Sequence, residues 1–221
     1  MIVESEANEL LELYWVPPGA GTSVGSHAVW FSGGTYERLI AAIQQRSQRP
    51  LVHSALIAHT ARGPYAVEMT PVPAHGLAEE RGVVGGAALG SRLLGRSGVF
   101  RYEVGRWLDG VIPDIGYAID SPVVISTDPD EVEHLLDLVP DLPPAVWGRD
   151  HAHAGEMWNS KSVVSWTLER AGLAERAGKP PQVGRARGWD AGVEMARRLG
   201  TTAGRSPSAR GRDRTGPEVR T

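Results

Sequence analysis

Runs of apolar and β-branched residues along the first half of the chain predict several strands. A strand is predicted at Leu10–Val16, where an apolar run ends at a Pro-Pro-Gly turn. A second is predicted at Ser26–Phe31. Leu51–His59 and Tyr65–Pro71 are β-prone runs joined by a short loop that contains Gly63, and this pattern predicts a hairpin.

The middle of the chain predicts two further β segments. Gly82–Gly98 is rich in glycine but lacks the G-x-x-x-x-G-K-[ST] pattern of a phosphate-binding loop, so a loop with one strand is predicted there. Val99–Trp107 alternates between apolar and charged positions, which predicts a strand with one apolar face and the charges, Glu103 among them, on its solvent face.

Helical spacing of apolar residues predicts four helices. A short amphipathic helix is expected at Thr35–Gln45. A second opens at Asp128-Pro129, with Asp128 as its cap, and runs to Leu138 with an apolar stripe of Val132, Leu135 and Leu136.

The later part of the chain carries the other two. The strongest helix pattern runs from Asn159 or Ser160 to Ala171, is apolar over a wide face and stops at Gly172, so a buried central helix is expected. A last helix is predicted at Trp189–Leu199, capped by Asp190.

This order of elements predicts an α+β fold, in which an antiparallel sheet packs against a buried helix. Residues 1–199 are expected to form a single globular domain. Residues 200–221 consist of Ser, Pro, Gly and Arg without apolar anchors, and they are expected to be a disordered, arginine-rich tail.

Composition restricts the classes of function. The 221-residue chain has no cysteine, which excludes disulfides, thiolate metal sites and a cysteine nucleophile. Its net charge of −3 argues against nucleic acid as a partner, and an anionic membrane would require a local basic patch. There is no secretory signal pattern and no apolar run long enough for a membrane span, so a cytoplasmic protein is expected.

A polar cluster directly before the buried helix is the first candidate site. Ser160 is expected at a helix start, where unpaired backbone N–H groups would stabilise an alkoxide or the oxyanion of an attacked carbonyl. Because Asn and Ser are also the preferred N-capping residues, capping alone accounts for Asn159 and Ser160 without any catalysis.

A serine nucleophile needs a base, and His53 in the first hairpin strand is the best candidate, with Glu68 on the paired strand to orient it. The alternative is an ordinary strand histidine with a satisfied hydrogen bond and a solvated Glu68.

The chain has a strand histidine, a polar residue on the next strand, and Asn159-Ser160-Lys161-Ser162 at a helix start. In this arrangement it resembles the permuted papain-like superfamily of lecithin:retinol acyltransferase-like enzymes, with serine in place of the family's cysteine. The resemblance implies a permuted papain-like fold and the catalytic set Ser160, His53 and Glu68. The chain also resembles an uncharacterised family of high-GC bacterial proteins through His53-Ser54-Ala55-Leu56, Glu68-Met69-Thr70-Pro71, Trp147-Gly148-Arg149-Asp150 and Trp158-Asn159-Ser160.

The segment between Trp147 and Trp158 is the second candidate site. Trp147, Trp158, Arg149 and Asn159 are the predicted substrate-binding residues, although tryptophans here are also typical of a core or a pocket wall. His151 and His153 form an H-x-H pair without a third ligand at a recognisable spacing, so we predict neither a metal nor a cofactor.

Two hypotheses follow. The first is a papain-like hydrolase or acyltransferase in which Ser160 attacks a small-molecule or peptide-like substrate. The second is a catalytically inactive descendant, a pseudoenzyme, that binds a partner through the Trp147–Trp158 loop. The first requires Ser160 and His53 to lie within hydrogen-bond reach, whereas the second requires only a pocket.

Overall fold

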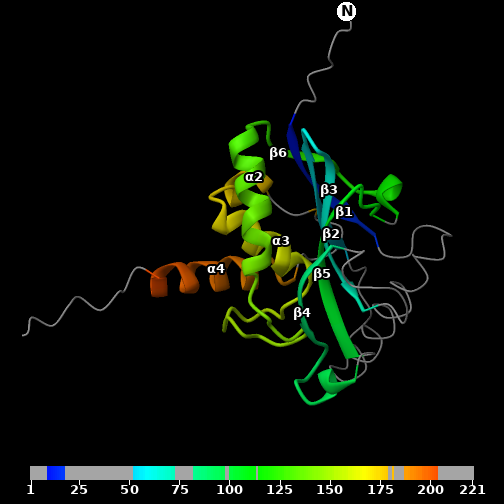
Figure 1. Cartoon of the computed structure of the whole chain (residues 1–221). Helices are drawn as coiled ribbons and strands as arrows, with labels where there is room; N and C mark the ends of the chain where they lie inside the picture. The colour runs from blue at the N-terminus through cyan, green and yellow to red at the C-terminus, as the bar shows by residue number, and fades with distance from the viewer. Residues whose placement is uncertain are drawn as a thin grey trace, which may run out of the picture.

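The computed structural model describes residues 9–17, 52–72, 82–97, 100–112, 114–178, 181 and 187–203. The described chain is an α+β structure with one six-stranded sheet in the order β4-β5-β3-β2-β1-β6, and every neighbouring pair is antiparallel. Helices α2, α3 and α4 all lie on one side of this sheet (Figure 1). The predicted fold class of an antiparallel sheet packed against a buried helix is therefore confirmed at this level.

The elements have the following bounds. The strands are β1 Leu10–Val16, β2 His53–Thr60, β3 Gly63–Pro71, β4 Val83–Ala88, β5 Arg101–Leu108 and β6 Val123–Ser126. The α-helices are α2 Pro129–Leu138, α3 Ser160–Arg170 and α4 Trp189–Ala203. Short 3-10 turns are η2 Leu94–Arg96, η4 Ile115–Tyr117, η5 Val139–Asp141 and η6 Ala174–Ala177.

The predicted strands around the hairpin are confirmed. β1 has the predicted bounds, β2 and β3 pair across the turn at Ala61-Arg62, and the glycine-rich segment contributes the single strand β4. The predicted strand at Ser26–Phe31 and the predicted helix at Thr35–Gln45 lie outside the described residues.

Both helices with clear start signals begin where the sequence indicates. Asp128 caps α2 by accepting a hydrogen bond from the Asp130 amide, and Val132, Leu135 and Leu136 are its buried residues. Asn159 caps α3, which ends before Gly172 at a φ of 74°, a left-handed conformation that glycine adopts without strain.

Helix α4 begins at Trp189 as predicted, but its capping residue and its last residue differ from the prediction. It continues through Gly200 to Ala203, beyond the expected domain end at residue 199. Asp190 lies inside its first turn, and the carboxylate of Glu156 accepts the hydrogen bonds of the Gly188 and Asp190 amides instead. The residues beyond 203 lie outside the described part of the chain.

The two faces of the sheet are distinct. The face toward the helices carries the main core, which includes Leu11, Leu13, Trp15, Val52, Leu56, Ala58, Val67, Met69, Tyr102 and Val104. The opposite face carries a second apolar cluster built from Val16, Ala55, Ala66 and Ile112, with Tyr14, Ile57, Trp107, Ile115 and Ala118 packed against it. Successive side chains of a strand alternate between the two faces of the sheet. The residues of β2 that belong to one of the two clusters therefore show which face each other residue of β2 points to.

Strand β5 corrects one prediction. Glu103 was expected on a solvent face, but it is only 7% exposed. The sheet is covered on both faces, so alternation along β5 does not separate a buried from a solvated side. Within the described residues, none of the helices has the length and hydropathy needed to span a bilayer.

Candidate functional site

His53 and Glu68 form a side-chain pair on neighbouring strands. The Nε2 atom of His53 lies 3.3 Å from the Oε2 atom of Glu68, and the side chains are 16% and 5% exposed. The β2–β3 register pairs Leu56 with Val67, and its extension by three residues would put His53 opposite Thr70, with Glu68 as a diagonal neighbour. The predicted orientation of His53 by Glu68 is therefore present in the structure.

This pair lies on the sheet face that points away from the helices. Val52 and Leu56 belong to the main core on the helix side, whereas Ala55 belongs to the opposite cluster. Alternation along β2 gives His53 the orientation of Ala55. Glu68 has the same orientation because its neighbours Val67 and Met69 both belong to the helix-side core.

Ser160 lies on the other side of β2. It is the first residue of α3 and is 5% exposed. The next residue, Lys161, donates from its Nζ atom to the carbonyl oxygen of Val52 over 2.7 Å, so the first turn of α3 contacts the backbone just before His53. No hydrogen bond joins Ser160 to His53, although both are described residues. The three residues of the predicted catalytic set are thus not assembled into one hydrogen-bonded unit.

The polar cluster at the start of α3 attaches α4. Asn159 accepts from the Lys161 amide and donates from Nδ2 to the Arg187 carbonyl oxygen at 2.7 Å. Ser162 accepts from the Asn159 amide and donates to the Gly188 carbonyl oxygen at 2.6 Å. Ser165 donates to the Trp189 carbonyl oxygen at 2.7 Å. These bonds satisfy backbone groups at the start of α4, so the cluster has a structural role that capping alone did not predict.

The predicted substrate-binding residues separate into two groups. Trp158 is 1% exposed in the main core, and the side chain of Asn159 is engaged by backbone groups. Trp147 is half-buried and meets the ring of Tyr102 edge-on, with centroids 6.2 Å apart. Arg149 alone of the four is exposed and lines a pocket.

The Trp147–Trp158 loop is held by backbone hydrogen bonds. Trp147 forms a parallel bridge with Leu89 just after β4, through bonds of 3.0 Å to the Ala88 oxygen and 2.9 Å from the Gly90 amide. Trp158 closes the loop by accepting from Gly148 and donating to the Arg149 oxygen, each over 2.9 Å. The loop is therefore fixed to the sheet edge at one end and to α3 at the other.

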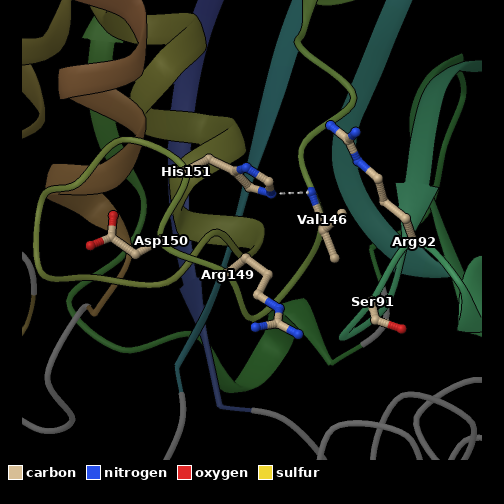
Figure 2. Close-up of a pocket in the computed structure, with 6 residues that line it drawn as sticks. All are labelled: Ser91, Arg92, Val146, Arg149, Asp150 and His151. Carbon is tan, nitrogen blue, oxygen red and sulfur yellow. Dashed lines mark hydrogen bonds between the residues drawn. The ribbon is translucent and has the colours of Figure 1, made fainter.

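A pocket of about 410 Å³ lies where this loop meets the connection between β4 and β5. Its lining residues are Ser91, Arg92, Val146, Arg149, Asp150 and His151 (Figure 2). Arg149 donates from Nε to the Gly90 carbonyl oxygen at 2.8 Å, which links its two walls. No further hydrogen bond of the described residues uses the terminal nitrogens of Arg149 or the guanidinium of Arg92.

Among the described residues, Asp150 forms no ion pair with either arginine of the pocket. Its two carboxylate oxygens accept the amides of Ala154 and Gly155, each over 2.9 Å. Figure 2 shows its side chain directed away from the guanidinium of Arg149. The lining thus holds two guanidinium groups against one carboxylate, and this excess of positive charge, together with the guanidinium N–H donors, suits a phosphate or carboxylate group.

His151 lines the pocket with a ring that accepts a backbone hydrogen bond. Its Nε2 atom accepts the Val146 amide over 2.9 Å, which puts the ring proton on Nδ1. Burial lowers the pKa of His151, and the nearby charges of Arg92 and Arg149 lower it further while Asp150 opposes them. Among the described residues, no three His, Asp or Glu side chains are grouped as a metal site would require.

Sequence reasoning identified Arg149 but missed Arg92 and Ser91. The signal was available in part, because residues 82–102 contain three arginines and no acidic residue. The segment was compared with phosphate-binding loops because of its glycines, and its excess of arginine over acidic residues was not used as a signal.

Comparisons with known proteins give no further assignment: no family model, no curated protein and no solved structure matches the chain.

Proposed function

We propose that this protein is a binding module that recognises an oxyanion group of its ligand, a phosphate or a carboxylate, in the pocket between Arg92 and Arg149. The observation that carries the proposal is the presence of two arginines, Arg92 and Arg149, in the lining of one pocket, with Arg149 fixed by its Nε bond to Gly90. Guanidinium groups present planar, paired N–H donors, which match the geometry of both oxyanions.

Preorganisation supports binding at this pocket. The Nε bond of Arg149 and the backbone ladder of the Trp147–Trp158 loop hold the guanidinium at the pocket before a ligand arrives. Less side-chain freedom then remains to be lost on binding, and this raises affinity.

The chemistry of the pocket favours binding over catalysis. A nucleophile would need an adjacent base, but Nε2 of His151 is engaged by the Val146 amide and the carboxylate of Asp150 by two further amides. This proposal corresponds to the second hypothesis from the sequence, a catalytically inactive module that binds through the Trp147–Trp158 loop.

Isothermal titration calorimetry of the full chain with inorganic phosphate and with acetate tests the proposal. We expect saturable binding of at least one of the two anions and a loss of roughly tenfold or more in affinity in Arg149→Gln, because a charge-assisted hydrogen-bond donor is removed. Arg198→Gln is the matched control, since Arg198 lies on α4 and pairs with Glu194. Equal affinity in wild type and both variants would contradict the proposal.

A second candidate function rests on the His53–Glu68 pair. In a hydrolase or acyltransferase, Ser160 would attack a substrate carbonyl, His53 would accept its proton at Nδ1, and Glu68 would hold His53 through Nε2. The side chains of Ser160 and His53 would have to meet around the start of β2. Labelling by a fluorophosphonate probe that disappears in both Ser160→Ala and His53→Ala would favour this candidate over the binding module.

The permuted papain-like topology is likewise a proposal. It is supported by the order of the elements, with His53 and Glu68 on successive strands followed by a buried helix whose first turn contacts the start of β2. The position of His53 on the face away from α3 argues against the catalytic use of that topology.

A further inference from the structure

The connection between β4 and β5 exposes large apolar side chains. Leu93 is 69% exposed and Phe100 is 44% exposed. The Leu89 amide donates to the Phe100 carbonyl oxygen over 2.8 Å, so the two strands close into a hairpin, and residues 90–97 belong to its tip. Figure 1 shows this tip, with η2, at one extremity of the molecule, away from α2 and α4. Exposed apolar side chains gathered at a protruding tip indicate an interaction surface.

Several arginines lie close to these two residues in the sequence. Arg92, Arg96 and Arg101 flank them on the hairpin, and Arg149 joins the tip through its bond to Gly90. Residues 82–102 contain no Asp or Glu, although the whole chain has a net charge of −3. We call the set Arg92, Leu93, Arg96, Phe100, Arg101 and Arg149 the hairpin-tip patch.

The exposed apolar residues near the other end of β5 lack this charge. Leu108 ends β5 at its other end, Val111 and Tyr117 follow it, and all three are exposed. Acidic residues are interspersed with them in sequence, namely Asp109, Asp114 and Asp120. An anionic partner would therefore be attracted to the hairpin-tip patch and not to that end of the sheet.

We propose that the hairpin-tip patch docks on an anionic phospholipid membrane. Leu93 and Phe100 enter the boundary between headgroups and acyl chains, and the arginines contact the headgroup phosphates around them. One of these phosphates occupies the pocket between Arg92 and Arg149, a part of the inference that rests on the proposed oxyanion-binding function. The protein lies on the membrane and does not cross it.

The physical basis combines two terms. Each arginine near an anionic surface adds electrostatic attraction that falls off within a Debye length, and insertion of Leu93 and Phe100 removes apolar area from water. A few apolar side chains alone give weak binding, so both terms are needed. Binding should accordingly be reversible and sensitive to salt.

Sedimentation of the full chain with sucrose-loaded vesicles tests the inference. We expect binding to vesicles of phosphatidylcholine with about 30% phosphatidylglycerol, little binding to pure phosphatidylcholine, and release as salt rises through roughly 0.1–1 M. The substitutions Arg92→Gln and Arg96→Gln should each lower the partition coefficient for anionic vesicles about fivefold. The double variant Leu93→Ser/Phe100→Ser should weaken it roughly tenfold or more.

Matched controls locate the docking surface. Val111→Ser removes an apolar side chain that is 77% exposed at the other end of the sheet, and Arg198→Gln removes an exposed arginine from α4. Both should bind vesicles as wild type does. Absence of binding to anionic vesicles, equal binding to neutral ones, or a loss in Val111→Ser but not in Leu93→Ser/Phe100→Ser would overturn the inference.

The same set of proteins separates this inference from the proposed function. Phosphate binding in solution that weakens in Arg149→Gln, with no binding of the wild-type protein to vesicles, would support the oxyanion pocket and refute membrane docking. If vesicle binding depends on Leu93 and Phe100 while phosphate does not bind in solution, membrane docking stands and the oxyanion pocket fails.

Discussion

The Nε atom of Arg149 donates to the carbonyl oxygen of Gly90 across 2.8 Å, and this bond joins two segments that are 59 residues apart in the sequence. It fixes the side chain of Arg149 while leaving its terminal nitrogens at the pocket. A lysine could supply the same charge, but its three N–H donors sit on one nitrogen, so it cannot bond Gly90 through one nitrogen and present a separate planar pair of donors to a ligand. The pocket thus depends on the shape of the guanidinium as well as on its charge.

Arg149→Lys tests that dependence. We expect phosphate affinity to fall about fivefold or more although the net charge is unchanged, because the bond to Gly90 and the paired donors are lost together. Titration calorimetry beside Arg149→Gln gives the comparison. An Arg149→Lys protein with wild-type affinity would mean that charge alone determines binding.

His151 should make stability depend on pH. Burial and the charges of Arg92 and Arg149 lower its pKa in the folded state, so the unfolded state binds a proton more readily. The contribution is fully present above the ordinary histidine pKa of about 6.5 and is lost as pH falls through that value toward the lowered folded pKa.

The measurement is the free energy of unfolding in urea at several pH values between about 5 and 8 for wild type and His151→Gln. The stability of wild type should fall relative to that of the variant as pH falls below about 6.5, because glutamine does not titrate. Parallel profiles for the two proteins would contradict the assignment of a lowered pKa to His151.

Two serines in the first turn of α3 should differ sharply. Ser162 is fully buried and bonds both the Asn159 amide and the Gly188 carbonyl oxygen, so Ser162→Ala should cost roughly 1–3 kcal/mol of stability. Ser160→Ala should change stability by no more than about 0.5 kcal/mol, because no hydrogen bond of the described residues uses its hydroxyl. Urea unfolding of both proteins measures the difference, and the reverse order would refute the structural role of the cluster.

Two glycines of α4 give a second matched pair. A Cβ atom at Gly192 would overlap the Ser162 carbonyl oxygen and the Ser165 hydroxyl, so Gly192→Ala should separate α4 from α3 and lower stability by about 1–3 kcal/mol. At Gly200 the nearest atom would be Arg170 Nη1 at 3.4 Å, and alanine there should be neutral or slightly stabilising. Thermal unfolding measures both; a tolerated Gly192→Ala would contradict the close packing of α3 and α4.

The sequence predicted those features that local chemistry determines. Asp128 and Asn159 indicate where their helices begin, because capping involves only the next few residues. The contact between His53 and Glu68 follows from a hairpin with a short turn. The pocket could not be predicted in this way. It depends on the pairing of Trp147 with Leu89, which no local pattern specifies.

The relation between Ser160 and His53 shows a different limit. Both residues occur where the sequence suggests, at a helix start and at a strand start, and the first turn of α3 does contact the start of β2. A difference of one residue in a strand reverses the face to which a side chain points. The apolar run of β2 is buried on both faces and gave no signal of which face His53 would occupy.

The most direct test of oxyanion binding is an NMR titration of the ¹⁵N-labelled full chain with inorganic phosphate. We expect saturable shifts for the amides of Gly90, Ser91, Val146 and Arg149, with those of Ser160 and Lys161 unchanged. Shifts confined to the start of α3 and to His53, or no saturable shift at the pocket, would contradict it.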